Sequence, residues 1–255
     1  MCAIIKAVAA RSGPPSQIFY RSSMMPEGVK WLLIANLGLF VAYFIATQFG
    51  FGGWFTPFGL VPGAVVFRGK IWQLVTYLFL HDPYGFGHIL WNMLPLWMFG
   101  KDLENVWGRK RFLQFYFLCG VGAGVCVVIA NLLFGNPNAM TIGASGAIYG
   151  LLLAFGMLFP DRELLFNFLF PIKAKYFVMI VGAIAFLSSI AAPGGGVSHF
   201  AHLGGMVIAY FYLKSSLMHR DLMSSLRYQY KDWKLRRAKK NFQVYMRKQG
   251  NRDIH

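Results

Sequence analysis

Six segments of this chain are long and apolar enough to cross a lipid bilayer as helices. A spanning helix needs about 20 mostly apolar residues, and the matching segments lie near residues 31–49, 87–103, 112–134, 144–160, 175–192 and 200–217. Hydrophobic residues make up 56% of the 255 residues and charged residues only 13%, a balance that excludes a water-soluble domain. A seventh apolar stretch, 71–80, is too short to span, and we expect it to belong to a structured loop at the membrane face. The sequence therefore predicts an all-α polytopic membrane protein, a bundle of six transmembrane helices.

The distribution of lysine and arginine predicts how this bundle is oriented. Cytoplasmic loops of membrane proteins carry an excess of both residues, and here they are frequent before the first segment, between the second and third, and between the fourth and fifth. Residues 135–143 and 193–198 contain neither, and the long loop 50–86 contains only Arg68 and Lys70. We therefore expect these three loops outside, both termini in the cytoplasm, and an even number of spans.

The formal net charge of +16 does not indicate a nucleic-acid-binding protein. Much of the positive charge follows His219, where lysines and arginines cluster among aromatic residues. A basic, aromatic-rich helix next to a last span is typical of segments that lie on anionic lipid headgroups. We expect this of the tail 218–255 and expect no nucleic-acid partner. A partner-binding helix and a disordered tail are the alternatives.

A serine lies at the start of the fourth apolar segment, in the run Gly143-Ala144-Ser145-Gly146-Ala147-Ile148-Tyr149-Gly150. A serine hydroxyl needs a base and oxyanion donors to act as a nucleophile. At a helix N-terminus the backbone N–H of Ser145 is unpaired and the helix dipole favours negative charge. Gly143 and Gly146 are small enough to let another backbone approach, so we include them as support for the site. The alternative is structural, because Gly146-x-x-x-Gly150 is also a helix-packing motif of membrane proteins.

A histidine in the sixth apolar segment supplies the candidate base. An ionisable residue inside a span is costly and indicates a functional site, and His202 is followed by Gly204-Gly205, which lets its helix press against the fourth. Tyr149 lies one helical turn after Ser145 and can pack on the imidazole and orient it. Ordinary core packing is the alternative for Tyr149.

The second apolar segment contributes two more polar side chains, His88 and Asn92. A spacing of four residues places both on one helical face, where an imidazole N–H and an amide can donate hydrogen bonds toward a common point. Donors arranged in this way are what an oxyanion hole requires. The alternatives are an interfacial histidine in contact with water and an asparagine that bonds a neighbouring helix.

These motifs together resemble the rhomboid family of intramembrane serine proteases. The resemblance runs from about residue 31 to 217 and rests on G-x-S-G-x-x-x-G at 143–150, H-x-x-x-N at 88–92 and A-H-x-G-G at 201–205. It implies a six-helix protease domain over 31–217, with a membrane-embedded outer loop between its first two helices. A cytoplasmic segment, 1–30, precedes this domain and the basic cytoplasmic tail, 218–255, follows it. The expected location is a bacterial cytoplasmic (inner) membrane, in which the protein is an integral, multi-pass component.

The resemblance also implies roles for the residues. By analogy, Ser145 is the nucleophile and His202 the general base. Asn92 and His88, with the backbone N–H of Ser145, are the oxyanion donors, and Tyr149 packs against His202. The implied reaction hydrolyses a peptide bond in or near the transmembrane segment of single-pass membrane proteins, which enter between the second and fifth spans.

Two further positions relate to the family outside this site. Glu104 and Arg109 resemble polar residues that brace the turn before the third span. Many relatives carry Trp-Arg in the outer loop where this chain has Trp72-Gln73, which puts in doubt a contact that braces the loop.

Two other functions fit the same residues. His88, His199 and His202 could form a three-histidine zinc centre, although the chain lacks a His-Glu-x-x-His helix and this reading leaves Ser145 and Asn92 unexplained. The chain could also be a rhomboid-like protein that binds transmembrane helices without cutting them. We expect the protease, with no cofactor and no metal.

Overall fold

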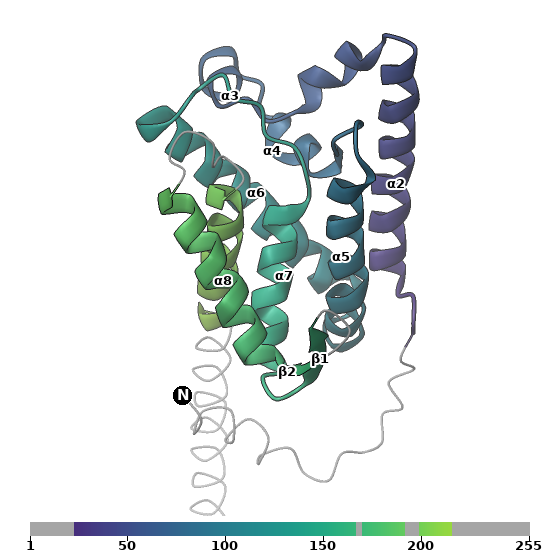
Figure 1. The fold of residues 1–255 in the computed structure, drawn as a ribbon, viewed down its shortest axis with the longest axis vertical. Coiled ribbons are helices and arrows are strands. Elements are labelled where there is room, and N and C mark those ends of the chain that lie inside the picture. Colours follow the sequence, from purple (N-terminus) through teal and green to yellow (C-terminus); the bar gives the residue numbers. More distant parts are fainter. Residues whose placement is uncertain (1–22, 167–169, 192–198, 216–255) are drawn as a thin grey trace, which may run out of the picture.

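The structure, a computed structural model, describes residues 23–166, 170–191 and 199–215. Its long helices are α2 (Glu27–Gln48), α5 (Phe86–Trp107), α6 (Arg109–Phe134), α7 (Ser145–Leu158) and α8 (Ala174–Ala191). Residues 199–215 form a further helix, which we call the last described helix. These helices cover the segments that the sequence analysis expected to span the membrane (Figure 1). The basic tail, 218–255, and most of the segment 1–30 lie outside the described residues.

The described helices differ in how well each could span a bilayer alone. By length and composition, α2 and α6 are long and apolar enough to cross a membrane. The apolar stretches of α7 and α8, Ser145–Leu158 and Ala174–Leu187, are shorter, and α5 carries His88, Asn92 and several charged residues. The two shorter helices and the more polar α5 therefore depend on packing against their neighbours.

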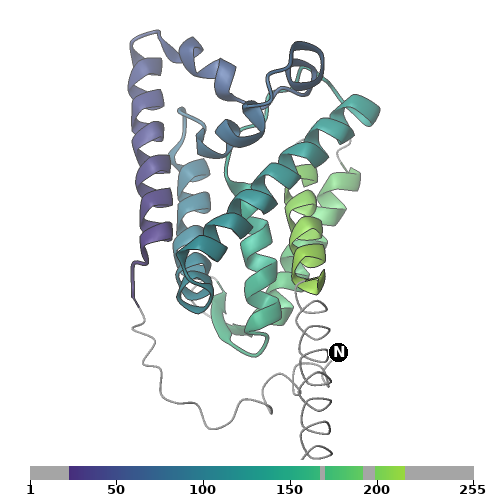
Figure 2. The same cartoon turned by 180° about the vertical axis from the view of Figure 1, so that it is seen from behind.

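Short elements cover the two ends of the bundle. The loop between α2 and α5 folds into η1 (Gly52–Phe58), α3 (Pro62–Arg68), α4 (Gln73–Thr76) and η2 (Tyr77–Phe79) at one end. At the other end β1 (Glu163–Phe166) and β2 (Phe170–Lys173) form an antiparallel hairpin. Figure 2 shows the same arrangement from behind, with α6 crossing the bundle obliquely.

Helix α7 is the central helix, and its glycines explain how closely its neighbours approach. A Cβ added at Gly150 would lie 2.7 Å from the Cβ of Cys119 on α6. One added at Gly156 would lie 2.6 Å from a methyl carbon of Val178 on α8. Small residues let membrane helices pack backbone to backbone, so α7 is enclosed on several sides.

A buried carboxylate joins the end of α5 to the start of α2. Glu104 is 4% exposed, and it accepts hydrogen bonds from the backbone N–H groups of Gly28 at 2.8 Å and Val29 at 2.7 Å. These groups belong to the unpaired first turn of α2, where the helix dipole also favours negative charge. Arg109 adds an exposed ion pair with Glu27 at 2.6 Å. Both residues thus connect the turn between α5 and α6 to the start of α2.

Backbone hydrogen bonds join the loop between α2 and α5 to the segment that leads into α7. Leu60 and Thr141 exchange backbone hydrogen bonds of 2.9 and 2.8 Å. The N–H of Gly143 donates to the carbonyl of Tyr77 at 2.9 Å, and the fully buried Tyr77 hydroxyl donates to the carbonyl of Gly120 on α6 at 2.7 Å. The stretch 71–80 is therefore a structured part of the loop, with its inner side in the protein core.

Gln73 braces the loop between α2 and α5, where the sequence analysis had put a bracing contact in doubt. Its side chain is buried. The amide oxygen accepts from the N–H of Val61 at 3.0 Å, and the amide nitrogen donates to the carbonyl of Pro57 at 3.1 Å. Trp72 donates to the same carbonyl at 3.2 Å. A neutral side chain thus ties the start of α4 to the residues beside Leu60.

We expect Gln73→Ala to lower the free energy of unfolding by about 1–3 kcal/mol, because it leaves the backbone N–H of Val61 without its side-chain acceptor and removes one of the two donors to the Pro57 carbonyl. Chemical unfolding in detergent, followed by tryptophan fluorescence, measures the change. Gln48→Ala is the matched control, since Gln48 is exposed at the end of α2 and its loss should cost less than about 0.5 kcal/mol. Equal effects of the two variants would show that the Gln73 amide does not hold the loop.

The hairpin β1–β2 was not predicted from the sequence. Glu163 pairs with Lys173 in its register. Three ion pairs lie around the hairpin: Arg162 with Asp102 on α5 at 3.0 Å, and Asp161 with Lys175 at 2.8 Å and with Lys173 at 3.7 Å. The hydrogen bond and charge of Lys175 hold the pKa of the exposed Asp161 below its usual range. These contacts connect the α7–α8 turn to the end of α5 that lies away from Ser145.

Candidate active site

Ser145 and His202 lie within hydrogen-bond distance of one another. The Oγ of Ser145 is 2.9 Å from the Nε2 of His202. Ser145 is the first residue of α7, and His202 belongs to the last described helix. Both are half-buried. The two residues are separated by 57 positions in the chain, so helix packing alone brings the hydroxyl and the imidazole together.

The contact between these helices is made by backbone against backbone. A Cβ added at Gly205 would overlap the carbonyl oxygen of Gly146. A Cβ added at Gly146 would lie 3.2 Å from the carbonyl oxygen of Ala201 and 2.5 Å from the Cβ of Ala123 on α6. Neither position can hold a larger residue without moving a helix. The distance between Ser145 and His202 is therefore set by these two glycines.

Tyr149 lies flat against the imidazole of His202. The two ring centroids are 4.1 Å apart and the planes differ by 3°. Tyr149 is one turn along α7 from Ser145. The helix that carries the Ser145 hydroxyl therefore also fixes the plane of the His202 imidazole. This stacking leaves the edge of the imidazole, with its two nitrogens, free for hydrogen bonding.

His88 is held in one orientation by its neighbours. Its Nδ1 accepts a hydrogen bond from the backbone N–H of Asp82 at 3.2 Å. A neutral imidazole that accepts at Nδ1 carries its proton on Nε2, and the tautomer is assigned here from that bond. A Cβ added at Gly143 would lie 2.7 Å from this Nε2. The Nε2–H donor of His88 therefore lies beside the chain that leads directly into Ser145.

This contact changes the role expected for Gly143. The sequence analysis expected another backbone to approach it, but the space at its Cα is taken by the His88 ring. Gly143 also has a φ of +116°, which L side chains rarely adopt. A glycine is needed here for both the backbone turn before α7 and the position of the imidazole.

Asn92 uses one of its two amide hydrogens locally. Its Nδ2 donates to the carbonyl of His88 at 2.7 Å, one turn back on α5. The side chain is 3% exposed, and its Oδ1 has no hydrogen-bond partner among the described residues. The second hydrogen on Nδ2 is available as a donor. Asn92 can thus act on a bound group while its bond to the helix fixes its rotamer.

His81 completes this side of the site and was missed as a candidate. It is fully buried, and its ring centroid is 5.1 Å from that of His88. It lies in the turn after η2. Helical spacing could not reveal the contact, because His81 lies in an irregular turn whereas His88 belongs to α5.

The three-histidine metal site gains no support from this geometry. His199 contacts His202 edge to face, with ring centroids 6.1 Å apart, while His88 is bonded to Asp82. Within residues 23–166, 170–191 and 199–215, no group of three or more His, Cys, Asp or Glu side chains is arranged to hold a metal ion.

The fold and this site define a class of protein: a helical membrane protein with a serine–histidine pair between two packed helices. Comparison with known protein families identifies one family for this chain. Residues 68–217 match the model of the rhomboid domain, which covers more than half of the chain. The chain belongs to the rhomboid family and is an integral membrane protein.

Curated relatives include two proteins of one bacterium and a mitochondrial protein of yeast. The chain is 31% identical over 132 residues to the mitochondrial rhomboid protein 1 of Saccharomyces cerevisiae, covering 50% of this chain and 37% of that one. It is 31% identical over 156 residues to the rhomboid protease GluP of Bacillus subtilis, covering 60% and 28%. It is 32% identical over 141 residues to the putative rhomboid protease YdcA of the same bacterium, covering 55% and 65%. The matched region thus spans less than two thirds of each of these relatives.

Proposed function

We propose that this protein is an intramembrane serine endopeptidase of the rhomboid type, with six transmembrane helices and both termini in the cytoplasm. It hydrolyses a peptide bond in or near the transmembrane segment of single-pass membrane proteins. The observation that carries the proposal is the 2.9 Å contact between Ser145 Oγ and His202 Nε2. This contact is supported by the fit of Gly205 against Gly146. A bacterial cytoplasmic membrane is the proposed location.

The proposed chemistry follows from the atoms that meet at this point. His202 Nε2 accepts the proton of Ser145 as the hydroxyl oxygen attacks the substrate carbonyl. The negative charge that forms on the carbonyl oxygen is stabilised by the backbone N–H of Ser145, by His88 Nε2–H and by the free amide hydrogen of Asn92. His202 then protonates the leaving amine. The acyl-enzyme is released by a water molecule that gives a proton to His202.

The length of α7 supports cleavage within the membrane. Its 14 residues extend about 21 Å at 1.5 Å per residue, which is less than the roughly 30 Å of the hydrocarbon core. If the far end of α7 lies at one membrane surface, Ser145 lies about 10 Å below the other. A transmembrane substrate can therefore reach it, while the polar groups around it face the protein interior as a bilayer requires.

The proposed route for the substrate passes between α5 and α8. On α5, the residues just before Asn92 are apolar and exposed: Leu90 is 57% and Trp91 is 71% exposed. On α8, Met179 is 67% exposed. Apolar side chains on these helices provide a surface for a transmembrane helix, which unwinds locally to present an extended peptide to Ser145.

Inhibitor specificity tests this proposal directly. The detergent-purified protein, incubated with a model single-pass transmembrane substrate, should release two fragments, and a serine-directed isocoumarin should abolish the cleavage. EDTA should leave the rate unchanged. Cleavage stopped by EDTA and resistant to the isocoumarin would support a metal-dependent hydrolase. Binding of the substrate without cleavage would instead identify a rhomboid-like binding protein.

We expect Asn92→Ala to lower kcat by about 10²- to 10³-fold with a smaller change in KM, because an oxyanion donor acts on the transition state. Single-turnover cleavage in detergent separates the two parameters. Asn131→Ala on α6 is the matched control: Asn131 is also 3% exposed and donates to the carbonyl four residues back, that of Val127, at 3.0 Å. Similar rates for the two variants would remove Asn92 from the mechanism.

A further inference from the structure

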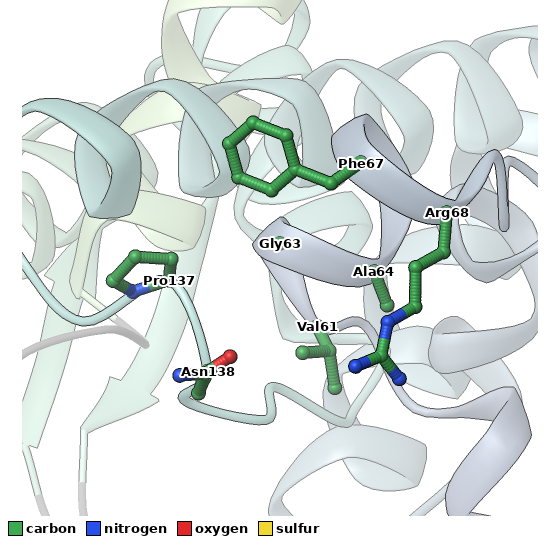
Figure 3. A pocket seen from close by; sticks show the side chains of 7 residues that line it. All are labelled: Val61, Gly63, Ala64, Phe67, Arg68, Pro137 and Asn138. Atoms are coloured by element: carbon green, nitrogen blue, oxygen red, sulfur yellow. The ribbon is translucent and has the colours of Figure 1, made fainter.

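A hollow of about 340 Å³ lies at the active-site end of the bundle, away from Ser145. It is bounded by α3 on one side and by the segment before α7 on the other, with Arg68, Asn138, Phe67 and Pro137 among its walls (Figure 3). The N–H of Gly63 donates to the carbonyl of Pro137 at 2.8 Å. This bond fixes the two walls relative to each other, so the hollow is part of the fold.

The polar groups of this hollow favour an anion. Arg68 and Lys70 are the only cations between residues 50 and 86. Within the described part of the chain Arg68 forms no ion pair, and the Asn138 side chain is exposed. Figure 3 shows the Arg68 guanidinium and the Asn138 amide on the same side of the hollow, flanking Val61, with the Phe67 ring on the other side. A charged donor and a neutral donor thus share one rim.

The apolar surroundings place this rim at the edge of the bilayer. Phe67 is 76% exposed, and at the end of α6 Leu133 and Phe134 are 65% and 78% exposed. Helix α6 is long and apolar enough to span the membrane, so its end at Phe134 marks the level of the lipid headgroups. An exposed cluster of large apolar side chains such as these is typical of a surface that contacts lipid. A ligand in the hollow therefore meets cationic and amide donors at one side and hydrocarbon at the other.

We propose that this hollow binds the phosphodiester headgroup of one anionic phospholipid from the leaflet on the active-site side. The Arg68 guanidinium matches two phosphate oxygens with parallel N–H donors, and the Asn138 amide donates to a third acceptor of the headgroup. The acyl chains lie along Phe67 and Phe134. A bound lipid bridges α3 and the segment leading to Ser145, parallel to the bond between Gly63 and Pro137.

Lipid titration of the full chain tests this site. Native mass spectrometry of the detergent-purified protein with phosphatidylglycerol should show about fivefold weaker binding for Arg68→Gln, the effect of one cation at a membrane surface. Lys70→Gln is the matched control. Lys70 lies two residues after Arg68 and does not line the hollow, so removing its charge should change the affinity less than twofold. Asn138→Ala, which weakens binding by removing the second donor, provides an independent test if Arg68→Gln does not fold.

Three outcomes would overturn the proposal. Equal affinities for Arg68→Gln and Lys70→Gln would mean that lipid binding is diffuse attraction to surface charge. Displacement of the lipid by 10 mM inorganic phosphate, on the order of a concentration at which a weak anion site fills, would identify a site for a free anion. Displacement by a soluble acidic peptide would assign the hollow to a polypeptide partner. Binding that resists both competitors and depends on Arg68 supports the lipid site.

Discussion

Ser145→Ala and His202→Ala should each lower the cleavage rate by about 10³-fold or more, while the protein still inserts and folds. The two side chains act as one unit, because the hydroxyl loses its proton to the imidazole 2.9 Å away. The double variant should therefore be no slower than either single one. Cleavage of a model transmembrane substrate measures the rate, and thermal unfolding in detergent measures the fold.

Ser215→Ala is the control for a general effect of removing a serine. Ser215 lies on the last described helix, where its exposed hydroxyl donates only to the carbonyl of Tyr212 at 2.9 Å. Its loss should leave both rate and stability unchanged. Substantial activity in folded Ser145→Ala would show that another group is the nucleophile. It would also favour the alternative that the site is a metal centre.

The sequence was most informative where chemistry depends on residues close together in the chain. The short motif around Ser145 placed Tyr149 one turn away, and the structure stacks this ring on His202. The spacing of His88 and Asn92 likewise predicted one helical face, and the Asn92 amide donates to the backbone carbonyl of His88 one turn back. Such regularities follow from helix geometry alone, so no knowledge of the packing was needed.

Contacts made by irregular segments could not be predicted in this way. Tyr77 reaches α6 and the chain before α7 from a short 3-10 turn, and His81 packs on His88 from the next turn. Their positions depend on how the loop folds as a whole, which no periodic pattern encodes. The hairpin β1–β2 gave no recognisable sequence pattern, because its strands are four residues each and lie between two long apolar segments.

Gly205→Ala should have the second largest effect on the site. The added methyl would overlap the carbonyl oxygen of Gly146, and a backbone atom cannot rotate away as a side chain can. The two helices must then separate, at a cost of about 1–3 kcal/mol or more. A displacement of about 1 Å between reacting groups costs about 10²-fold in rate. We therefore expect loss of stability and an activity below about 1% of the wild-type rate.

Two other glycine variants separate this steric effect from that of adding a methyl to any helix. A Cβ at Gly38 on α2 meets nothing within 4 Å, and one at Gly182 on α8 meets only the flexible end of Met206, at 3.2 Å. Both variants should stay within about 1 kcal/mol of the wild type, since alanine favours the helix by a similar amount. Cleavage rates and unfolding midpoints of the three variants, measured in the same detergent, provide the comparison. A Gly205→Ala protein as active as the other two would show that the fit between α7 and the last described helix does not set the distance from Ser145 to His202, and the structural basis of the proposed dyad would fail.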